Sequence, residues 1–149
     1  MNYDVTSSFT QIVETDPGKA REVLAQIEPM RSLADRLSAL GLDDRALWCE
    51  GSEELGYRLI WRFDAEGANA LLDWRLSVAA DGAGRTVVTL KLAGRGSDTD
   101  ARGRVLSSWP LLEELAEGHT RRLARALEDY SDENESEYDF GRPSLHAVV

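Results

Sequence analysis

The sequence has one cysteine, two histidines and no long apolar run, and each shortage excludes a class of protein. Cys49 has no partner in the chain, so no internal disulfide is possible, which favours a reducing compartment. No apolar stretch approaches the roughly 18–20 residues that a membrane span needs. Residues 1–4 have neither the basic nor the apolar region of a signal peptide, so we expect a cytoplasmic protein.

Basic residues are outnumbered, because 17 Lys and Arg stand against 27 Asp and Glu, for a net charge of −10. This balance argues against general nucleic-acid binding. Much of the excess lies in residues 128–139, which hold seven acids and no Lys or Arg, so the rest of the chain is only mildly acidic. We therefore predict one folded domain over residues 1–130, followed by a disordered acidic tail over residues 131–149.

The motifs of several large enzyme classes are also missing. The chain has no GxSxG, HExxH or GxGxxG, and its glycine-rich stretch at residues 81–84 is not followed by Lys-Ser or Lys-Thr. His119 and His146 are the two histidines, and their separation offers no metal-ligand spacing. The sequence therefore predicts no metal and no cofactor, and it leaves the oligomeric state open.

The pattern in the first third of the chain predicts one strand followed by two short helices. Residues 5–13 alternate weakly, with valines and a phenylalanine on one face. Asp16 and Pro17 are typical of a helix start, with Asp16 as the N-cap. A second apolar stripe at helical spacing begins after Pro29 and ends at Gly41, a residue suited to a C-terminal cap.

The middle of the chain changes to a period of two, which predicts strands over residues 46–50, 57–63, 69–80 and 86–94. The turn at residues 81–84 has the composition of a hairpin. Consecutive alternating strands with short links predict an antiparallel meander with one face exposed to water.

Beyond Gly96 the period is helical again. Thr99 or Asp100 is expected to cap this helix, and Pro110 to kink or restart it. The apolar stripe then consists of Val105, Trp109, Leu112, Ala116, His119, Leu123, Ala126 and Tyr130. Charged residues such as Glu113 and Glu117 are placed on the opposite face. A helix of this length with one apolar face must lie against the inner face of the sheet.

This order of elements resembles the START-like superfamily, also called SRPBCC or polyketide cyclase/dehydrase-like. The residues that carry the resemblance are Asp16-Pro17 followed by Val23-Leu24, and the segments Leu72–Gly94 and Ser107–Leu127. The resemblance implies an α+β helix-grip fold, with a curved antiparallel sheet of about five to seven strands around a long C-terminal helix. About five strands are recognisable here, and the segment 42–56 is where another would be sought.

The resemblance further implies a hydrophobic cavity between the sheet and the last helix. Members of the superfamily use it to bind lipids, sterols or polyketides, some cyclise polyketides, and others assist chaperones. The residues expected to line it are Tyr57, Leu59, Trp61, Trp74, Leu76, Leu90, Trp109, Leu112, Ala116 and His119. The tryptophans are either aromatic walls with indole N–H groups that orient a ligand, or simply the core of a small domain.

His119 is the candidate general acid or base, since the pKa of histidine lies near neutrality, and Tyr57 is a second candidate proton donor. The alternative is a core histidine satisfied by a backbone or hydroxyl group. Ser7, Gln11, Tyr57 and Thr86 also have inward parity. A buried polar group needs a partner, which a ligand or an ordered water would supply. If the first strand were flipped, Thr10 and Ile12 would face inward instead.

These observations favour a non-catalytic domain that binds a small apolar or aromatic molecule and no nucleic acid. One alternative is a cyclase- or aromatase-like enzyme that uses His119 or Tyr57. Another is an interaction module with a filled core, whose acidic tail contacts a basic partner.

Deleting residues 131–149 should leave the melting temperature almost unchanged, because a charged segment with few apolar residues contributes little to a core. Thermal unfolding followed by circular dichroism measures this. A large drop would show that the tail is part of the fold.

Overall fold

A computed structural model describes residues 3–39, 46–52, 56–62 and 70–132, without the side chains of residues 46–52 and 130–132. The predicted cap at Gly41 lies outside the described residues. The tail predicted over residues 131–149 is described only at residues 131–132, which still belong to the last helix, and the rest of it also lies outside the described residues. The elements run in the order β1 (Val5–Val13), α1 (Pro17–Ile27), α2 (Pro29–Ala39), β2 (Ala46–Ser52), β3 (Gly56–Arg62), β4 (Ala70–Ala80), β5 (Thr86–Gly96) and α3 (Thr99–Asp132).

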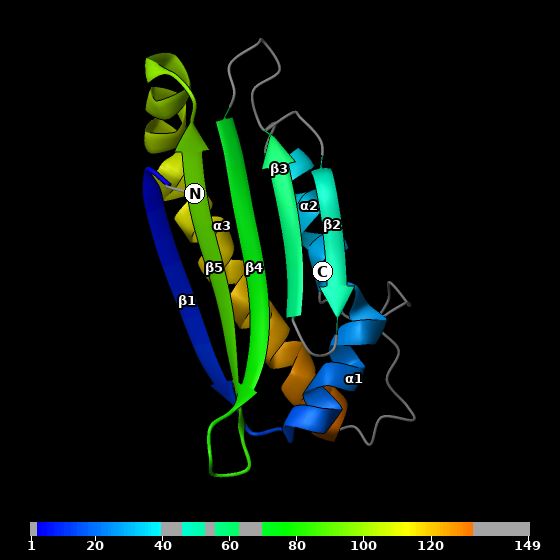
Figure 1. Cartoon of the computed structure of the whole chain (residues 1–149). Coiled ribbons are helices and arrows are strands. Elements are labelled where there is room, and N and C mark those ends of the chain that lie inside the picture. Colours follow the sequence, from blue (N-terminus) through cyan, green and yellow to red (C-terminus); the bar gives the residue numbers. More distant parts are fainter. Residues whose placement is uncertain (1–2, 40–45, 53–55, 63–69, 133–149) are drawn as a thin grey trace.

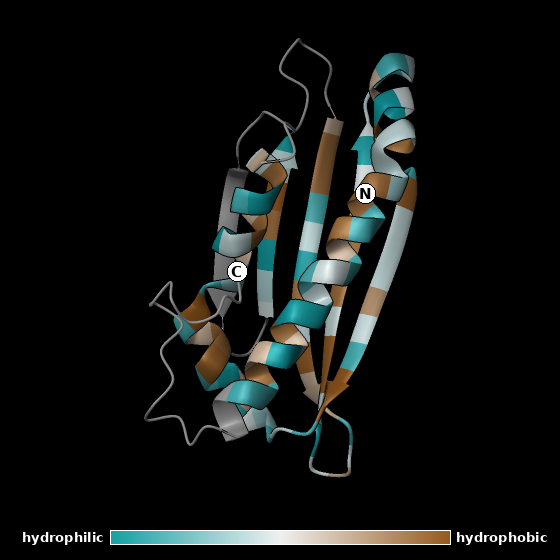
Figure 2. Cartoon of the chain, turned by 180° about the vertical axis from the view of Figure 1, so that it is seen from behind, coloured by the Kyte–Doolittle hydropathy of each residue, from teal (hydrophilic) through white to brown (hydrophobic). Residues whose placement is uncertain are grey.

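The five described strands form one antiparallel sheet in the order β1-β5-β4-β3-β2. All three helices lie on the same face of this curved sheet (Figure 1). The α3 helix packs mainly against β1 and β5, while α1 contacts β4 and α2 contacts β3. The predicted α+β architecture, with a long C-terminal helix against an antiparallel sheet, is confirmed. Figure 2 shows the helical side, where α3 crosses the sheet diagonally.

The start of α1 is capped as the sequence predicted. The Asp16 carboxylate accepts a hydrogen bond of 3.1 Å from the Lys19 backbone N–H, and Pro17 occupies the first turn. The helix ends at Ile27, and its C-cap Glu28 has a left-handed φ of 49° that lets the chain turn at once into α2 at Pro29. One residue therefore separates the two helices.

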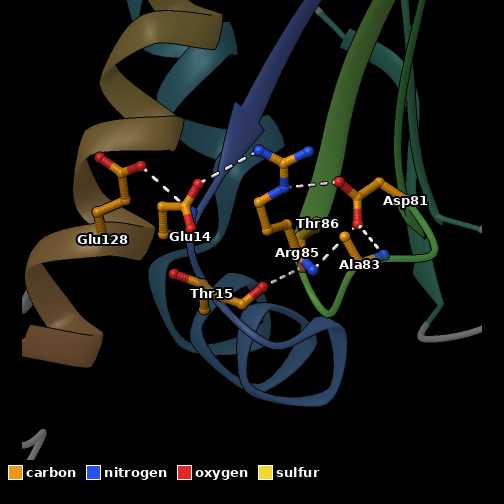
Figure 3. Close-up of polar contacts among 7 residues, drawn as sticks. All are labelled: Glu14, Thr15, Asp81, Ala83, Arg85, Thr86 and Glu128. Atoms are coloured by element: carbon orange, nitrogen blue, oxygen red, sulfur yellow. Dashed lines mark hydrogen bonds and ion pairs between the residues drawn. The ribbon is translucent and has the colours of Figure 1, made fainter.

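The hairpin between β4 and β5 is organised by Asp81. Its carboxylate accepts hydrogen bonds from the backbone N–H groups of Ala83 (2.8 Å) and Arg85 (3.1 Å) and from the Arg85 side chain (2.7 Å). The same guanidinium reaches Glu14 at the end of β1, 3.5 Å away (Figure 3). The hairpin thus fixes the end of β1 as well as its own turn.

The N-cap of α3 is Asp98, one residue before the first of the two predicted caps, Thr99 and Asp100. The Asp98 carboxylate accepts from the Ala101 N–H at 2.8 Å, so Asp98 is the N-cap, and Thr99 and Asp100 are already helical. The predicted restart at Pro110 is also wrong, because the helix continues through that residue. A proline inside a helix removes one backbone hydrogen bond, and the packing of the long apolar face outweighs that loss.

Alternation along the strands places the core as predicted. On β1 the odd residues are half-buried or buried and the even residues exposed, with Ile12 51% exposed and Val13 fully buried. The flipped register for this strand is therefore wrong. The predicted stripe of α3 from Val105 to Leu123 and Ala126 is buried, and the side chain of Tyr130 lies outside the described residues.

The helix and the sheet approach most closely at two glycines of β5. A Cβ atom added to Gly94 would lie 2.7 Å from both Val105 and Trp109 of α3. A Cβ atom on Gly96 would overlap the backbone at Ala101 and Arg102. The absence of side chains at these two positions lets the first turns of α3 lie directly on the sheet.

Gly94→Ala should destabilise the fold by about 1–3 kcal/mol, because Val105 and Trp109 must shift to admit the methyl group. Urea denaturation measures this change. The matched control is Gly103→Ala in α3, where an added Cβ meets no atom within 4 Å. That variant should be neutral or more stable, since alanine is the better helix former. Equal stability of the two variants would contradict the close-packing argument.

Candidate functional site

The residues predicted to line the interior do meet between the sheet and the helices. Nine of the ten are at most 6% exposed, and Tyr57 is half-buried. Apart from His119, they belong to or pack against a single hydrophobic cluster. Trp74 and Leu112 are fully covered by protein, so the interior is filled at these positions.

The register of β3 and β4 places two indole rings next to each other on the inner face. Trp61 lies opposite Leu72, and Leu59 lies opposite Trp74, so the two tryptophans are diagonal neighbours. Such neighbours are separated by roughly 7–8 Å between their backbones, within reach of aromatic side chains. The Nε1 atoms of Trp61 and Trp74 are buried, and neither has a hydrogen-bond partner within the part of the chain that the structure describes.

The third predicted wall residue, Trp109, is different because its polar atom is already used. Its indole N–H donates to the Ser7 hydroxyl at 2.9 Å, and Ser7 donates to the Glu113 carboxylate at 2.6 Å. Glu113 was expected on the outer face of α3, and this expectation is wrong: its carboxylate reaches β1. Ser7 therefore has its partners within the protein, and so does Thr86, which donates to the Thr15 carbonyl at 2.5 Å.

His119 is a buried histidine, 2% exposed, that contacts the first residue of α2. Its Nε2 lies 3.1 Å from the Pro29 carbonyl oxygen. A carbonyl only accepts, so Nε2 carries the proton and Nδ1 is an acceptor. Nδ1 is buried and has no partner among the described residues. The sequence offered two interpretations of His119, a general acid or base and a core histidine satisfied by a backbone or hydroxyl group. The bond to the Pro29 carbonyl fits the second.

The charge state of His119 follows from these surroundings. Its pKa is lowered from 6.5 to about 4, mainly by burial and also by the charges of Arg36 and Arg122, while the bond to the Pro29 carbonyl opposes this shift. The imidazole is therefore neutral at physiological pH. A neutral ring whose N–H is held by a carbonyl is poorly placed to act as a general acid.

A groove of about 410 Å³ lies on the surface where α2 and α3 meet. Its lining includes apolar and cationic side chains, among them Arg36, Leu111, Leu115, Arg121 and Arg122. The Nε atom of Arg36 is buried without a hydrogen-bond partner in the described part of the chain. Leu115 and Arg122 of the groove lie one helical turn before and after His119 on α3, so this buried histidine is adjacent to the groove. Sequence reasoning missed Arg36, since nothing in its spacing separates it from an exposed helical arginine.

The outer face of the sheet carries a polar cluster that the sequence did not predict. Asp73 of β4 is 4% exposed and binds Arg58 of β3 through two hydrogen bonds, of 2.9 and 2.8 Å. It also accepts from the Tyr3 hydroxyl at 2.6 Å and from Arg75 at 3.2 Å. Although burial opposes them, these hydrogen bonds and the charge of Arg58 lower the pKa of Asp73 to about 2.

No group of three or more His, Cys, Asp or Glu side chains in the described part of the chain is placed to hold a metal ion. In the same part of the chain, no helix combines the length and the apolar character needed to cross a bilayer.

Comparisons with known proteins add little to this geometry. No protein-family model and no curated protein matches the chain. Among solved structures, the crystal structure of TTHA0849 from Thermus thermophilus is similar, with 12% identity and a TM-score of 0.43. The alignment covers 87% of this chain and 99% of that chain. A similarity at this level carries no inference about function.

The lowered pKa of His119 makes a prediction about acid stability. Between pH 6.5 and about 4 the unfolded chain binds a proton at this residue that the folded chain does not, so stability is lost as the pH falls through that window. The loss approaches about 3 kcal/mol at pH 4, at about 1.4 kcal/mol for each pKa unit. His119→Gln removes this contribution.

The measurement is the free energy of unfolding in urea at several pH values for both proteins. The advantage of the wild type over His119→Gln should be largest near neutral pH and shrink on acidification. Contributions of the carboxylates cancel in this difference. An advantage that does not change with pH would show that His119 titrates normally in the folded protein.

Proposed function

We propose that this protein is a non-catalytic binding domain for a small apolar or aromatic molecule, held between the sheet and α3. The observation that carries the proposal is that four of the five buried side-chain atoms with no partner in the described chain are Trp61 Nε1, Trp74 Nε1, His119 Nδ1 and Arg36 Nε. The fifth, Arg62 Nε, belongs to the last residue of β3 and is not part of the proposed site. Unpaired polar atoms in a protein interior cost about 1–3 kcal/mol each, so several together need an explanation. A bound molecule would supply their partners.

The chemistry of these atoms describes the ligand. The indole groups of Trp61 and Trp74 and the Nε of Arg36 donate hydrogen bonds, while Nδ1 of His119 accepts one. A hydroxyl group can serve both kinds of partner, and a carbonyl serves the donors. Trp61 and Trp74 belong to the buried hydrophobic cluster, so the part of the molecule that lies beside them should be apolar.

The groove between α2 and α3 is the route by which we propose that the ligand enters. Its lining includes exposed apolar surface, since Leu111 is 43% exposed. It also includes Arg36, whose Nε has no hydrogen-bond partner among the described residues, and the buried His119 is adjacent to it. Because Trp74 and Leu112 are fully covered in this state, entry requires α2 and α3 to separate or the core to repack. The free energy of that change lowers the apparent affinity.

An enzymatic role has less support. The N–H of His119 is occupied by the Pro29 carbonyl, and its low pKa makes the ring a weak base at neutral pH. No described carboxylate orients it. The interaction module with a filled core is the alternative that the experiment below separates from the binding domain.

Native mass spectrometry of the full chain, purified from its own host, should detect a co-purifying small molecule. Trp74→Phe keeps an aromatic ring but removes the indole N–H, so occupancy should fall as the dissociation constant rises about threefold to tenfold, the effect of one lost hydrogen bond. The same spectra measure bound and free protein for each variant.

Trp109→Phe is the matched control, because the N–H of Trp109 is already bonded to Ser7. This variant should be less stable but retain the ligand at wild-type occupancy. If the wild type carries no bound molecule, the interior is a filled core and the interaction module is the better interpretation. If both variants lose the ligand equally, the loss reflects stability and not a contact with Trp74.

A further inference from the structure

The outer face of the sheet has a pocket of about 550 Å³ over β1, β5 and β4. The described helices lie on the opposite face, so none of them covers it (Figure 1). Six of its nine lining residues come from two rows of the sheet: Thr6, Ala93 and Asp73 are in register in one, and Ser8, Lys91 and Arg75 in the other. This pocket is separate from the interior site.

The pocket owes its shape to side chains of different length. Thr6, Ser8 and Ala93 are short and leave a hollow, while Tyr3 and Arg75 border it with long side chains. Tyr3 precedes β1, and its side chain extends across β5. Its hydroxyl donates a hydrogen bond of 2.6 Å to the Asp73 carboxylate on β4. One wall of the pocket is therefore fixed in place before any ligand arrives.

The register brings like charges together beside this hollow. Lys91 lies directly opposite Arg75, and Arg75 lies directly opposite Arg58 on the next strand. Like charges at directly opposite positions destabilise a sheet, and in this row the register places an acid, Glu50 of β2, opposite Arg58 alone. The pair of Lys91 and Arg75 therefore requires other compensation. It stands out in a chain whose net charge is −10.

Asp73 compensates only part of this charge. Its two oxygens are bound by Arg58 through two hydrogen bonds and by the Tyr3 hydroxyl. Arg75 reaches it through a single contact of 3.2 Å, and its side chain remains 55% exposed. Lys91 forms no ion pair with any other described side chain. The uncompensated positive charge therefore lies at Lys91 and Arg75, which both line the pocket.

We propose that this pocket binds a small molecule with a phosphate or carboxylate group. The anionic group lies between Lys91 and Arg75, with the Ser8 hydroxyl, opposite Lys91 in the register, as a further donor. The organic part of the molecule lies in the hollow over Ala93, beside the ring of Tyr3. The pocket thus recognises negative charge and a small planar or apolar body together.

The test is a titration of the full-length ¹⁵N-labelled chain, followed by NMR, with phenyl phosphate, benzoate and inorganic phosphate as separate probes. Amide signals of residues 6, 8, 91 and 93 should shift, up to about 10 mM of probe, where even millimolar sites fill. Phenyl phosphate binding more tightly than benzoate assigns the site to phosphates, and the reverse order assigns it to carboxylates. Inorganic phosphate should be the weaker of the two phosphates, because it has no group for the hollow.

Lys91→Gln should weaken phenyl phosphate binding at least tenfold. The matched control is Lys19→Gln, since Lys19 is the other lysine of the chain and lies in α1, away from the outer face. Ala93→Leu keeps every charge but fills the hollow, so it should weaken phenyl phosphate more than inorganic phosphate. Both Lys91 and Ala93 lie on the outer face of the sheet, and amide spectra of the variants report whether they fold.

The proposal is overturned if no probe shifts these signals, or if Lys19→Gln weakens binding as much as Lys91→Gln does. It is also overturned if Ala93→Leu leaves the binding of phenyl phosphate unchanged, because the anion would then sit on exposed charge and not in the pocket.

Discussion

The packing of α3 on β1 and β5 is the constraint on which the rest of the structure depends. Gly94 and Gly96 allow the start of the helix to lie directly on the sheet, and Thr15 at the end of β1 donates to the Leu127 carbonyl near its other end. Because the helix is fixed at both ends, its middle must cross the sheet at one position. That position puts His119 against the start of α2 and determines which inner side chains are enclosed.

The two faces of the sheet handle polar groups differently. On the inner face, Trp109 and Thr86 are satisfied by the protein, whereas Trp61 and Trp74 have no partner in the described chain. On the outer face the single carboxylate of Asp73 holds two arginines and a tyrosine. The two proposed sites therefore rest on different imbalances. In the interior, several buried polar atoms have no partner among the described residues. Beside the outer pocket, Arg75 shares the carboxylate of Asp73 with Arg58, while Lys91 forms no ion pair with a described side chain.

Most of the fold could be predicted from the sequence, because period-two and helical patterns report directly which residues are buried. Local features that depend on a single side chain were harder to predict. Examples are the N-cap at Asp98 and the hydrogen bond between Ser7 and Glu113. The Asp73 cluster could not be predicted, since it joins residues that are distant in sequence and meet only through the register of three strands. Parity placed Trp61 and Trp74 inside, but only coordinates show that their indole groups have no partner among the described residues.

The position of β1 at the edge of the sheet has a consequence for folding. Val5 pairs with Gly94, so the partner of the first strand is far away in the sequence and is synthesised much later. Contacts between such distant segments close large loops, and their formation slows folding. The meander from β2 to β5 has short connections by comparison and can assemble first. The surface on which α3 rests is therefore complete only when the N-terminal strand docks, which makes that docking a late step in forming the native state.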